Sequence, residues 1–300
     1  MKEAAPSMKN GYNMKVIRLC LRTCFQKWFM SPRIPVLFLF VLSFGFWTSG
    51  GVASIAKIMD EPVSPWLLPH YFANPLMMSL FGFLVTFLFN DAPFYDHHTA
   101  FVLIRSGRKN WIVAKVLYVV IAAFLNALCW LVASLLPVLG RLQFTSDWGK
   151  VMISLANGQG ASIAAEHDIP LAFFVSNQIC DQYSGPEAML LSFLLLWFVG
   201  VFLGFLIFCF NAWLGNNWGV IASGILSFLA LFSTTYFIYW FFGNKLLYFS
   251  PVNWCSLYSL ATGENISAPS LFHVFLVLSL CICGMIELIG KRFQKHDILL

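Results

Sequence analysis

The sequence contains few charged residues, and this scarcity excludes most classes of soluble protein. Asp, Glu, Lys and Arg together make up 10% of the 300 residues, whereas hydrophobic residues make up 59%. The mean hydropathy of +0.77 leaves too few polar side chains to cover the surface of a soluble domain. The composition therefore favours an integral membrane protein.

The long apolar runs are also almost free of ionisable groups, and Lys115 and Glu287 lie near the ends of their runs. Proton pumps, ion-coupled transporters and intramembrane proteases need such groups at membrane depth. The eight cysteines show no metal-ligand spacing, and the sequence contains no Gly-x-x-x-x-Gly-Lys-Ser/Thr phosphate loop. We therefore expect no enzyme, no metal site and no bound cofactor, and if the chain takes part in active transport, a separate subunit must hydrolyse the nucleotide.

Six stretches are long enough for helices that cross a bilayer, which needs about 20 apolar residues per helix. They are continuous runs rather than short alternating segments, which favours helices over a β-barrel. The sequence therefore predicts an all-α integral membrane protein with six transmembrane helices, of which the second is the shortest. The predicted spans are residues 34–56, 72–89, 111–139, 188–210, 218–242 and 271–290.

The charges are distributed unevenly between the two sides of these runs. Fourteen of the eighteen Lys and Arg fall in residues 1–33, in and just after the loop 90–110, and in the tail 291–300, whereas eight of the thirteen Asp and Glu fall on the other side. The positive-inside rule then places both termini in the cytoplasm and the loop 141–187 outside. The basic arm is adjacent to a span, which indicates contact with anionic membrane lipid rather than nucleic acid.

Residues 14–30 have the pattern of an amphipathic helix that precedes the first span. Ile17, Leu21 and Trp28 recur on one face, and Arg18 and Arg22 lie on the other. A basic helix of this kind lies in the plane of the membrane interface. It can serve as a simple juxtamembrane anchor or as a surface for a cytoplasmic partner.

The loop 90–110 carries signals for a short helix. Asp91 shortly before proline predicts a helix start, and Arg105, Gly107 and Arg108 predict its end. Such a helix, with exposed aromatic side chains, could transmit the movement of a partner into the spans. The alternative is a solvated loop in which the two arginines only set the topology.

The outer segments carry weaker signals. In the loop 141–187, residues 163–167 and 171–179 are predicted as short helices, and residues 249–254 as a short helix that dips back toward the interface. Cys180 and Cys255 both lie on the outer side, so a disulfide between them is one alternative to two free thiols.

The whole arrangement resembles the ABC-2 type transporter permeases. The resemblance is carried by an amphipathic N-terminal helix, six spans and an inside loop after the second span. Three stretches add local similarity: Phe89-Asn90-Asp91-Ala92-Pro93 leading to Arg105-Ser106-Gly107-Arg108-Lys109-Asn110-Trp111, then Ser250-Pro251-Val252-Asn253-Trp254, and the basic ending Lys291-Arg292-Phe293-Gln294-Lys295-His296-Asp297-Ile298-Leu299.

This resemblance implies a permease subunit in a bacterial plasma membrane that pairs with a second permease subunit and docks cytoplasmic ABC ATPase subunits, which bind the ATP. It implies export of a peptide, an antibiotic or another amphipathic substrate. By position, the ATPase contact would include Asp91, Phe94, Tyr95, Arg105 and Arg108, and the interfacial helix would present Ile17, Leu21 and Trp28.

The alternative hypothesis is a membrane protein of the same fold that does not transport a substrate. Under this hypothesis the chain is a sensor, an immunity protein or a scaffold that acts through the loop 141–187. Deletion of residues 143–182 would then abolish function.

Overall fold

Helices form nearly all the regular structure in the part of the chain that the structure describes. The structure is a computed structural model that describes residues 12–94, 99–215, 217–232, 243–260 and 268–295. Four of its helices are long and apolar enough to cross a membrane. They are α2 (Arg33–Met59), α6 (Arg108–Leu135, continued by the 3₁₀ helix η1, Leu136–Arg141), α10 (Gly185–Leu214) and α13 (Leu271–Lys295).

The helix α10 lies at the centre of the bundle and contacts α4, α6, α11 and α13. Its side chains are apolar on every face, as expected for a helix surrounded by other helices. In contrast, α13 lies at the edge, with only 17% of its most apolar window buried. Its apolar character therefore reflects a surrounding that is not water.

Two further apolar helices, α4 (Pro75–Phe89) and α11 (Trp218–Phe232), are shorter. Each has 15 residues, which gives a length of about 22 Å, whereas the hydrocarbon core of a bilayer is about 30 Å thick. The start of α4 is set by Asn74, whose side chain accepts a hydrogen bond from the Leu76 N–H, followed by proline. The remainder of the predicted span 218–242 lies outside the described residues.

The helices α4 and α11 pack through small and hydroxyl side chains. Ser79 Oγ donates to the Ser227 carbonyl at 2.7 Å, and the hydroxyls of Thr86 and Ser223 lie 2.6 Å apart. Between them, a Cβ placed on Gly82 would lie 2.9 Å from Ser227 Cβ. Small residues with interhelical hydrogen bonds are typical of helix packing in membranes, where apolar burial alone gives little attraction between helices.

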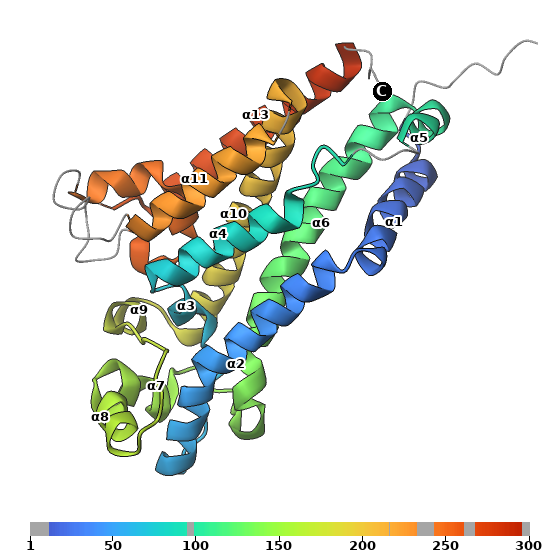
Figure 1. Cartoon of the computed structure of the whole chain (residues 1–300). Helices are drawn as coiled ribbons and strands as arrows, with labels where there is room; N and C mark the ends of the chain where they lie inside the picture. Colours follow the sequence, from blue (N-terminus) through green and yellow to red (C-terminus); the bar gives the residue numbers. More distant parts are fainter. Residues whose placement is uncertain (1–11, 95–98, 216, 233–242, 261–267, 296–300) are drawn as a thin grey trace, which may run out of the picture.

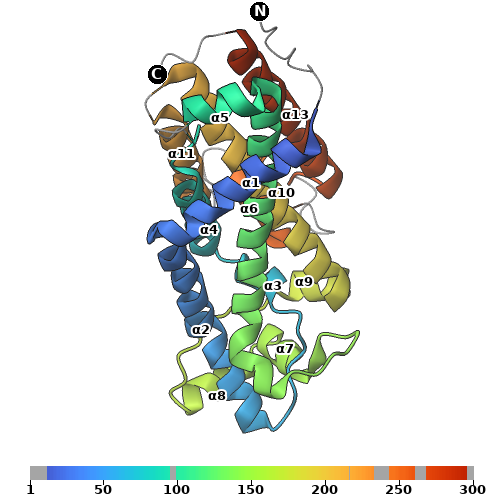
Figure 2. The same cartoon turned by 90° about the vertical axis from the view of Figure 1, so that its right-hand side faces the viewer.

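The two ends of the bundle carry different elements. Figures 1 and 2 show α1 (Met14–Met30) and α5 (Thr99–Ser106) at the same end as the C-terminal part of α13. The opposite end carries α7 (Gly149–Ala156), α8 (Gln159–Glu166) and α9 (Asn177–Gln182); we call residues 142–184, which contain these three helices, the cap. The short helix α3 (Leu68–Tyr71) lies between α2 and α4 in the sequence.

The cap differs from the sequence prediction in detail. The predicted helix 163–167 falls largely within α8, but the predicted helix 171–179 is wrong over residues 171–176, where no helix forms. Phe173 and Val175 are buried there, and Phe173 packs edge-on against Tyr71 of α3. These tertiary contacts hold the segment in a non-helical conformation, and α9 begins only at Asn177.

The predicted short helix near residue 250 is present as a 3₁₀ helix, η3 (Pro251–Cys255), flanked by η2 (Gly243–Phe249) and η4 (Leu257–Ser259). It is buried, and it contacts α4, α10 and α11. Val252 reaches the neighbourhood of Gly82, the middle of α4. The segment therefore penetrates between helices.

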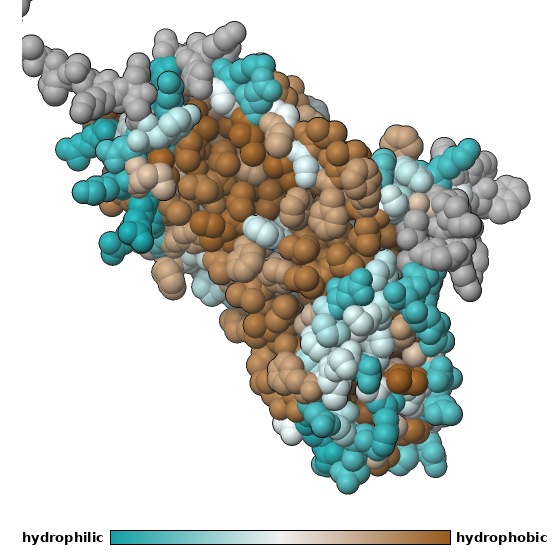
Figure 3. Space-filling model, turned by 180° about the vertical axis from the view of Figure 1, so that it is seen from behind, coloured by the Kyte–Doolittle hydropathy of each residue, from teal (hydrophilic) through white to brown (hydrophobic). Residues whose placement is uncertain are grey.

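Exposed apolar side chains cover the middle of the molecule. Figure 3 shows a broad brown surface between two regions that are mostly teal and white. Soluble monomers rarely expose large contiguous apolar patches, so this surface is typical of contact with lipid. The side chains include Leu39, Phe40, Phe46 and Trp47 of α2, Phe83 and Phe87 of α4, Leu128 and Val132 of α6, Ile221, Ile225 and Phe228 of α11, and Leu276 and Leu280 of α13.

Candidate functional site

The junction of α1, α2, α5 and α6 brings together most of the predicted functional residues. Helix α1 crosses α6 (Figure 2), and Ile17, Cys20 and Cys24 of α1 are buried. Leu21 and Trp28 are partly buried on the same side. This face packs on the protein, because α6 offers it a complementary apolar surface. That α1 lies in the plane of the membrane interface stays a prediction.

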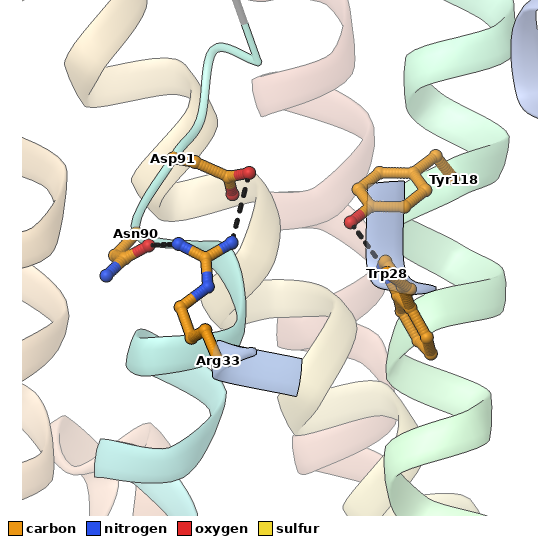
Figure 4. Close-up of polar contacts among 5 residues, drawn as sticks. All are labelled: Trp28, Arg33, Asn90, Asp91 and Tyr118. Atoms are coloured by element: carbon orange, nitrogen blue, oxygen red, sulfur yellow. Dashed lines mark hydrogen bonds and ion pairs between the residues drawn. The ribbon is translucent and has the colours of Figure 1, made fainter. Parts of the chain in front are cut away.

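Other apolar residues of α1 remain available to a membrane. Leu19, Phe29 and Met30 are exposed, Phe29 by 91%. Trp28 Nε1 donates to the Tyr118 hydroxyl of α6 at 2.9 Å, which fixes the C-terminal half of α1 (Figure 4). Helix α1 thus has one side on the bundle and exposed apolar groups elsewhere.

The side chain of Asn110 joins three elements at this end. Its Oδ1 accepts from the backbone N–H of Asn13 at 3.0 Å, and its Nδ2 donates to the Ser106 carbonyl at 2.8 Å. Asn13 is also the N-cap residue of α1. The beginning of α1 is therefore tied to the turn between α5 and α6.

Helix α5 ends where the sequence predicts. Gly107, at φ +75°, separates α5 from α6, a backbone angle that favours glycine. Val102 packs toward α1 and α6, whereas Phe101 and Ile104 are 67% and 66% exposed. We define the α5 patch as the exposed residues Phe101, Ile104, Arg105 and Arg108.

The segment before α5 differs from the prediction. Asp91 does not begin a helix: residues 91–93 form a turn, and α5 begins at Thr99. Arg33 at the start of α2 forms an ion pair with Asp91 at 3.1 Å and also donates to the Asn90 side chain (Figure 4). The turn is thus held by α2.

Phe94 is buried rather than displayed. Its ring packs edge-on against Tyr118 and Phe208, with centroids 5.1 Å and 5.4 Å away. The predicted exposed aromatic at this position is therefore wrong, because rings from α6 and α10 enclose it. Tyr95, the other aromatic proposed for the contact, lies outside the described residues. Phe101 of α5, which the predicted contact did not include, is exposed.

Two cavities lie beside α1, and both are lined by Lys27 and Lys115. The larger has a volume of about 260 Å³ and the smaller about 190 Å³. Arg33, Asp91 and Phe94 also line the larger cavity. Lys115, which the sequence places near the end of a span, is 5% exposed and is therefore a buried cation.

The groups that contact the Lys115 ammonium are weak hydrogen-bond acceptors. Nζ lies 3.2 Å from Cys24 Sγ and 5.3 Å from the ring centroids of both Phe94 and Trp111. No described carboxylate forms an ion pair with it. A buried cation without a carboxylate is costly, and aromatic faces offset only part of that cost.

Two thiols, Cys20 beside the smaller cavity and Cys180 in the cap, are protonated at neutral pH. Burial raises the pKa of Cys20 above its usual range and raises that of Cys180 to about 11. Cys180 and Cys255 are free thiols, so the alternative of a disulfide between them is not realised. Over the described ranges, no three His, Cys, Asp or Glu side chains are grouped to hold a metal ion.

Comparisons with family models, curated proteins and solved structures found no match to this chain. The class that the fold defines is a helical membrane protein with at least four helices able to span the bilayer. Its distinguishing feature is the junction at one end, where α1 and α5 flank the start of α6.

Proposed function

We propose that this chain is the membrane-spanning permease subunit of an ATP-driven exporter, and that the α5 patch docks a separate cytoplasmic ABC ATPase. The proposal includes a second permease subunit, an amphipathic substrate such as a peptide or an antibiotic, and a bacterial plasma membrane. It also includes six spans, with α4 and α11 as the short pair, and both termini in the cytoplasm.

The observation that carries the proposal is the α5 patch itself. Helix α5 lies at the end of the bundle, it directly precedes the long helix α6, and it exposes Phe101 and Ile104 next to Arg105. Apolar and aromatic groups beside arginine are typical of the energetic centre of protein interfaces. A push on α5 would reach α6 through Val102 and Asn110, which are both packed at the junction.

The distribution of charge supports the proposed orientation. The described carboxylates at the α5 end, Asp91 and Glu287, are each paired with a cation, at 3.1 Å and 2.6 Å. The excess of positive charge at that end is what the positive-inside rule assigns to the cytoplasm. The cations there are Lys15, Arg18, Arg22, Lys27, Arg33, Arg105, Arg108, Lys109, Lys115, Lys291 and Arg292.

The docking role can be tested by reversing two charges. The double variant Arg105→Glu with Arg108→Glu should insert and fold normally, because both side chains are exposed. It should lower the transport-linked ATPase rate of the assembled complex about tenfold or more. The two glutamates would repel the acidic groups that the arginines are proposed to contact, and like charges at an interface cost several kcal/mol.

Lys57→Glu is the matched control, because Lys57 is equally exposed but lies at the cap end of α2. It should leave the coupled rate unchanged. Full coupling in the double variant, measured beside this control, would reject the docking assignment.

The alternative of a sensor, immunity protein or scaffold rests on the cap. The cap exposes Phe144 by 80% and Phe174 by 58%, which is the observation that favours it. Deleting residues 143–182 no longer discriminates the two functions, because that segment contributes Met152 and Ile179 to the core. The double variant Phe144→Ser with Phe174→Ser is a sharper test: it should spare an exporter and impair a cap-dependent binder.

A further inference from the structure

We propose that the cavity between α1 and α6 binds the phosphate of an anionic membrane lipid, with Lys115 as its central ligand. This inference is independent of the proposed function and requires only that the bundle lies in a membrane. Burial of an ammonium group is energetically unfavourable unless a negative charge lies near it. Lys115 is buried, and none of the described carboxylates pairs with it.

The charges that line the cavity favour an anion. Lys27, Arg33 and Lys115 line the larger cavity, and among the described residues that line it Asp91 is the one carboxylate. Asp91 is already paired with Arg33, so none of the described carboxylates balances the charge of Lys115. Basic pockets between transmembrane helices bind anionic lipid headgroups.

The size and the walls of the cavity fit a headgroup fragment. A volume of about 260 Å³ exceeds by far what one water needs, which is roughly 10–15 Å³. It lies below the roughly 300–1,000 Å³ of pockets that enclose a drug-sized ligand. Trp28, Ile34 and Phe94 supply apolar walls beside the cations, which suits a phosphate joined to a glycerol and its acyl chains.

The depth of Lys115 also fits a lipid. It follows Arg108, the first residue of α6, by seven positions, which is about 10 Å along the helix axis. The headgroup layer is about 5–8 Å thick on each side of the hydrocarbon core. With Arg108 at the aqueous edge, the ammonium lies near the level where lipid phosphates meet the acyl region.

A lipid phosphate bound in the cavity would contact α1 as well as α6. Residues of α1 (Cys24, Lys27 and Trp28) and of α6 (Lys115 and Tyr118) line the same cavity, so a bound phosphate would hold the two helices together. Because the start of α1 is also joined to the α5–α6 turn, the lipid would stabilise the whole junction.

The test measures binding of soluble short-chain lipids to the full-length chain in a neutral detergent, by native mass spectrometry and by the shift in thermal unfolding. Short-chain phosphatidylglycerol should bind and stabilise the protein, whereas phosphatidylcholine and inorganic phosphate should not. Lys115→Gln should weaken phosphatidylglycerol binding about tenfold or more, and Lys115→Arg should restore most of it. Arg22→Gln, which removes an exposed charge from α1 that lines neither cavity, should bind normally.

Three outcomes would overturn the proposal. Equal binding of phosphatidylglycerol and phosphatidylcholine removes the anion requirement, and equal losses in Lys115→Gln and Arg22→Gln reduce the effect to general surface charge. Binding of inorganic phosphate that depends on Lys115 and competes with the lipid assigns the site to a soluble anion. If Lys115→Gln fails to fold, Lys27→Gln takes its place with the same expected loss.

Discussion

At the residue scale, buried polar groups determine how the ends of the bundle are held. His70 of α3 is buried under the cap, where its Nδ1 lies 3.3 Å from the Ser176 N–H and accepts from it. The neutral ring must then carry its proton on Nε2, which faces Cys180 Sγ at 3.9 Å. The ring also packs edge-on against Trp148. The sequence could not reveal this, because the partners of His70 are more than 70 residues away.

The burial of His70 predicts a loss of stability in acid. Burial lowers the pKa of His70 to about 3, from the ordinary 6.5 that it regains on unfolding. Between about pH 6.5 and pH 3, His70 therefore binds a proton in the unfolded chain but not in the folded chain. The free energy of unfolding should fall by about 1.4 kcal/mol per pH unit as the pH decreases from 6.5 toward 3, and be constant above 6.5 with respect to this group. Unfolding in detergent, followed between pH 8 and pH 5, measures this slope.

Two variants isolate the contribution of His70. His70→Gln should remove the slope, and His167→Gln should keep it, because His167 is exposed. An unchanged slope in His70→Gln would show that another group controls the acid sensitivity.

At the element scale, the sequence predicted the ends of helices better than their surroundings. Gly107 marks the end of α5 as expected, because a positive φ is a local property that one residue signals. Asp91 signals a helix start just as clearly, yet Arg33 from a distant helix takes its carboxylate and a turn results. The burial of Phe94 and Lys115 depends on rings from other helices and could not be predicted from the sequence.

The crossing of α4 and α11 makes a prediction with an internal control. A Cβ at Gly82 would clash with the Ser227 side chain, whereas a Cβ at Gly224 of α11 would meet nothing within 4 Å. Gly82→Ala should lower the free energy of unfolding by about 1–3 kcal/mol, because it overpacks the crossing. Gly224→Ala should be neutral or slightly stabilising, since alanine favours helix over glycine by about 1 kcal/mol. Equal unfolding midpoints for the two variants in detergent would contradict this packing.

At the scale of the whole molecule, we propose that the cap and α5 lie on opposite sides of a membrane. The lengths of the four long helices and the apolar band between the ends support that placement (Figures 1 and 3). The sequence predicted the bounds of α2, α4, α6, α10 and α13 to within a few residues, because hydropathy is a local signal. It could not predict that the loop 141–187 folds into a cap, since that depends on contacts with α2 and α3.

The orientation predicts which thiols can be labelled on intact cells. A cysteine at Phe144 of the cap should react with a membrane-impermeant thiol reagent, because that position is 80% exposed. A cysteine at Lys109, at the start of α6, should react only after the cells are permeabilised. The unsubstituted chain, labelled in parallel, corrects for its own exposed Cys281 and Cys283. The reverse pattern would invert the orientation.

The most direct test of the proposed function is a photo-crosslinking amino acid placed at Ile104, at the centre of the α5 patch, in cells that express the full chain. The account predicts that ultraviolet light joins Ile104, and not the same group placed at Phe144, to a protein that carries a nucleotide-binding phosphate loop. If no ATPase is attached at Ile104, or if it is attached equally at Phe144, the α5 patch is not the docking surface and the transporter proposal fails with it.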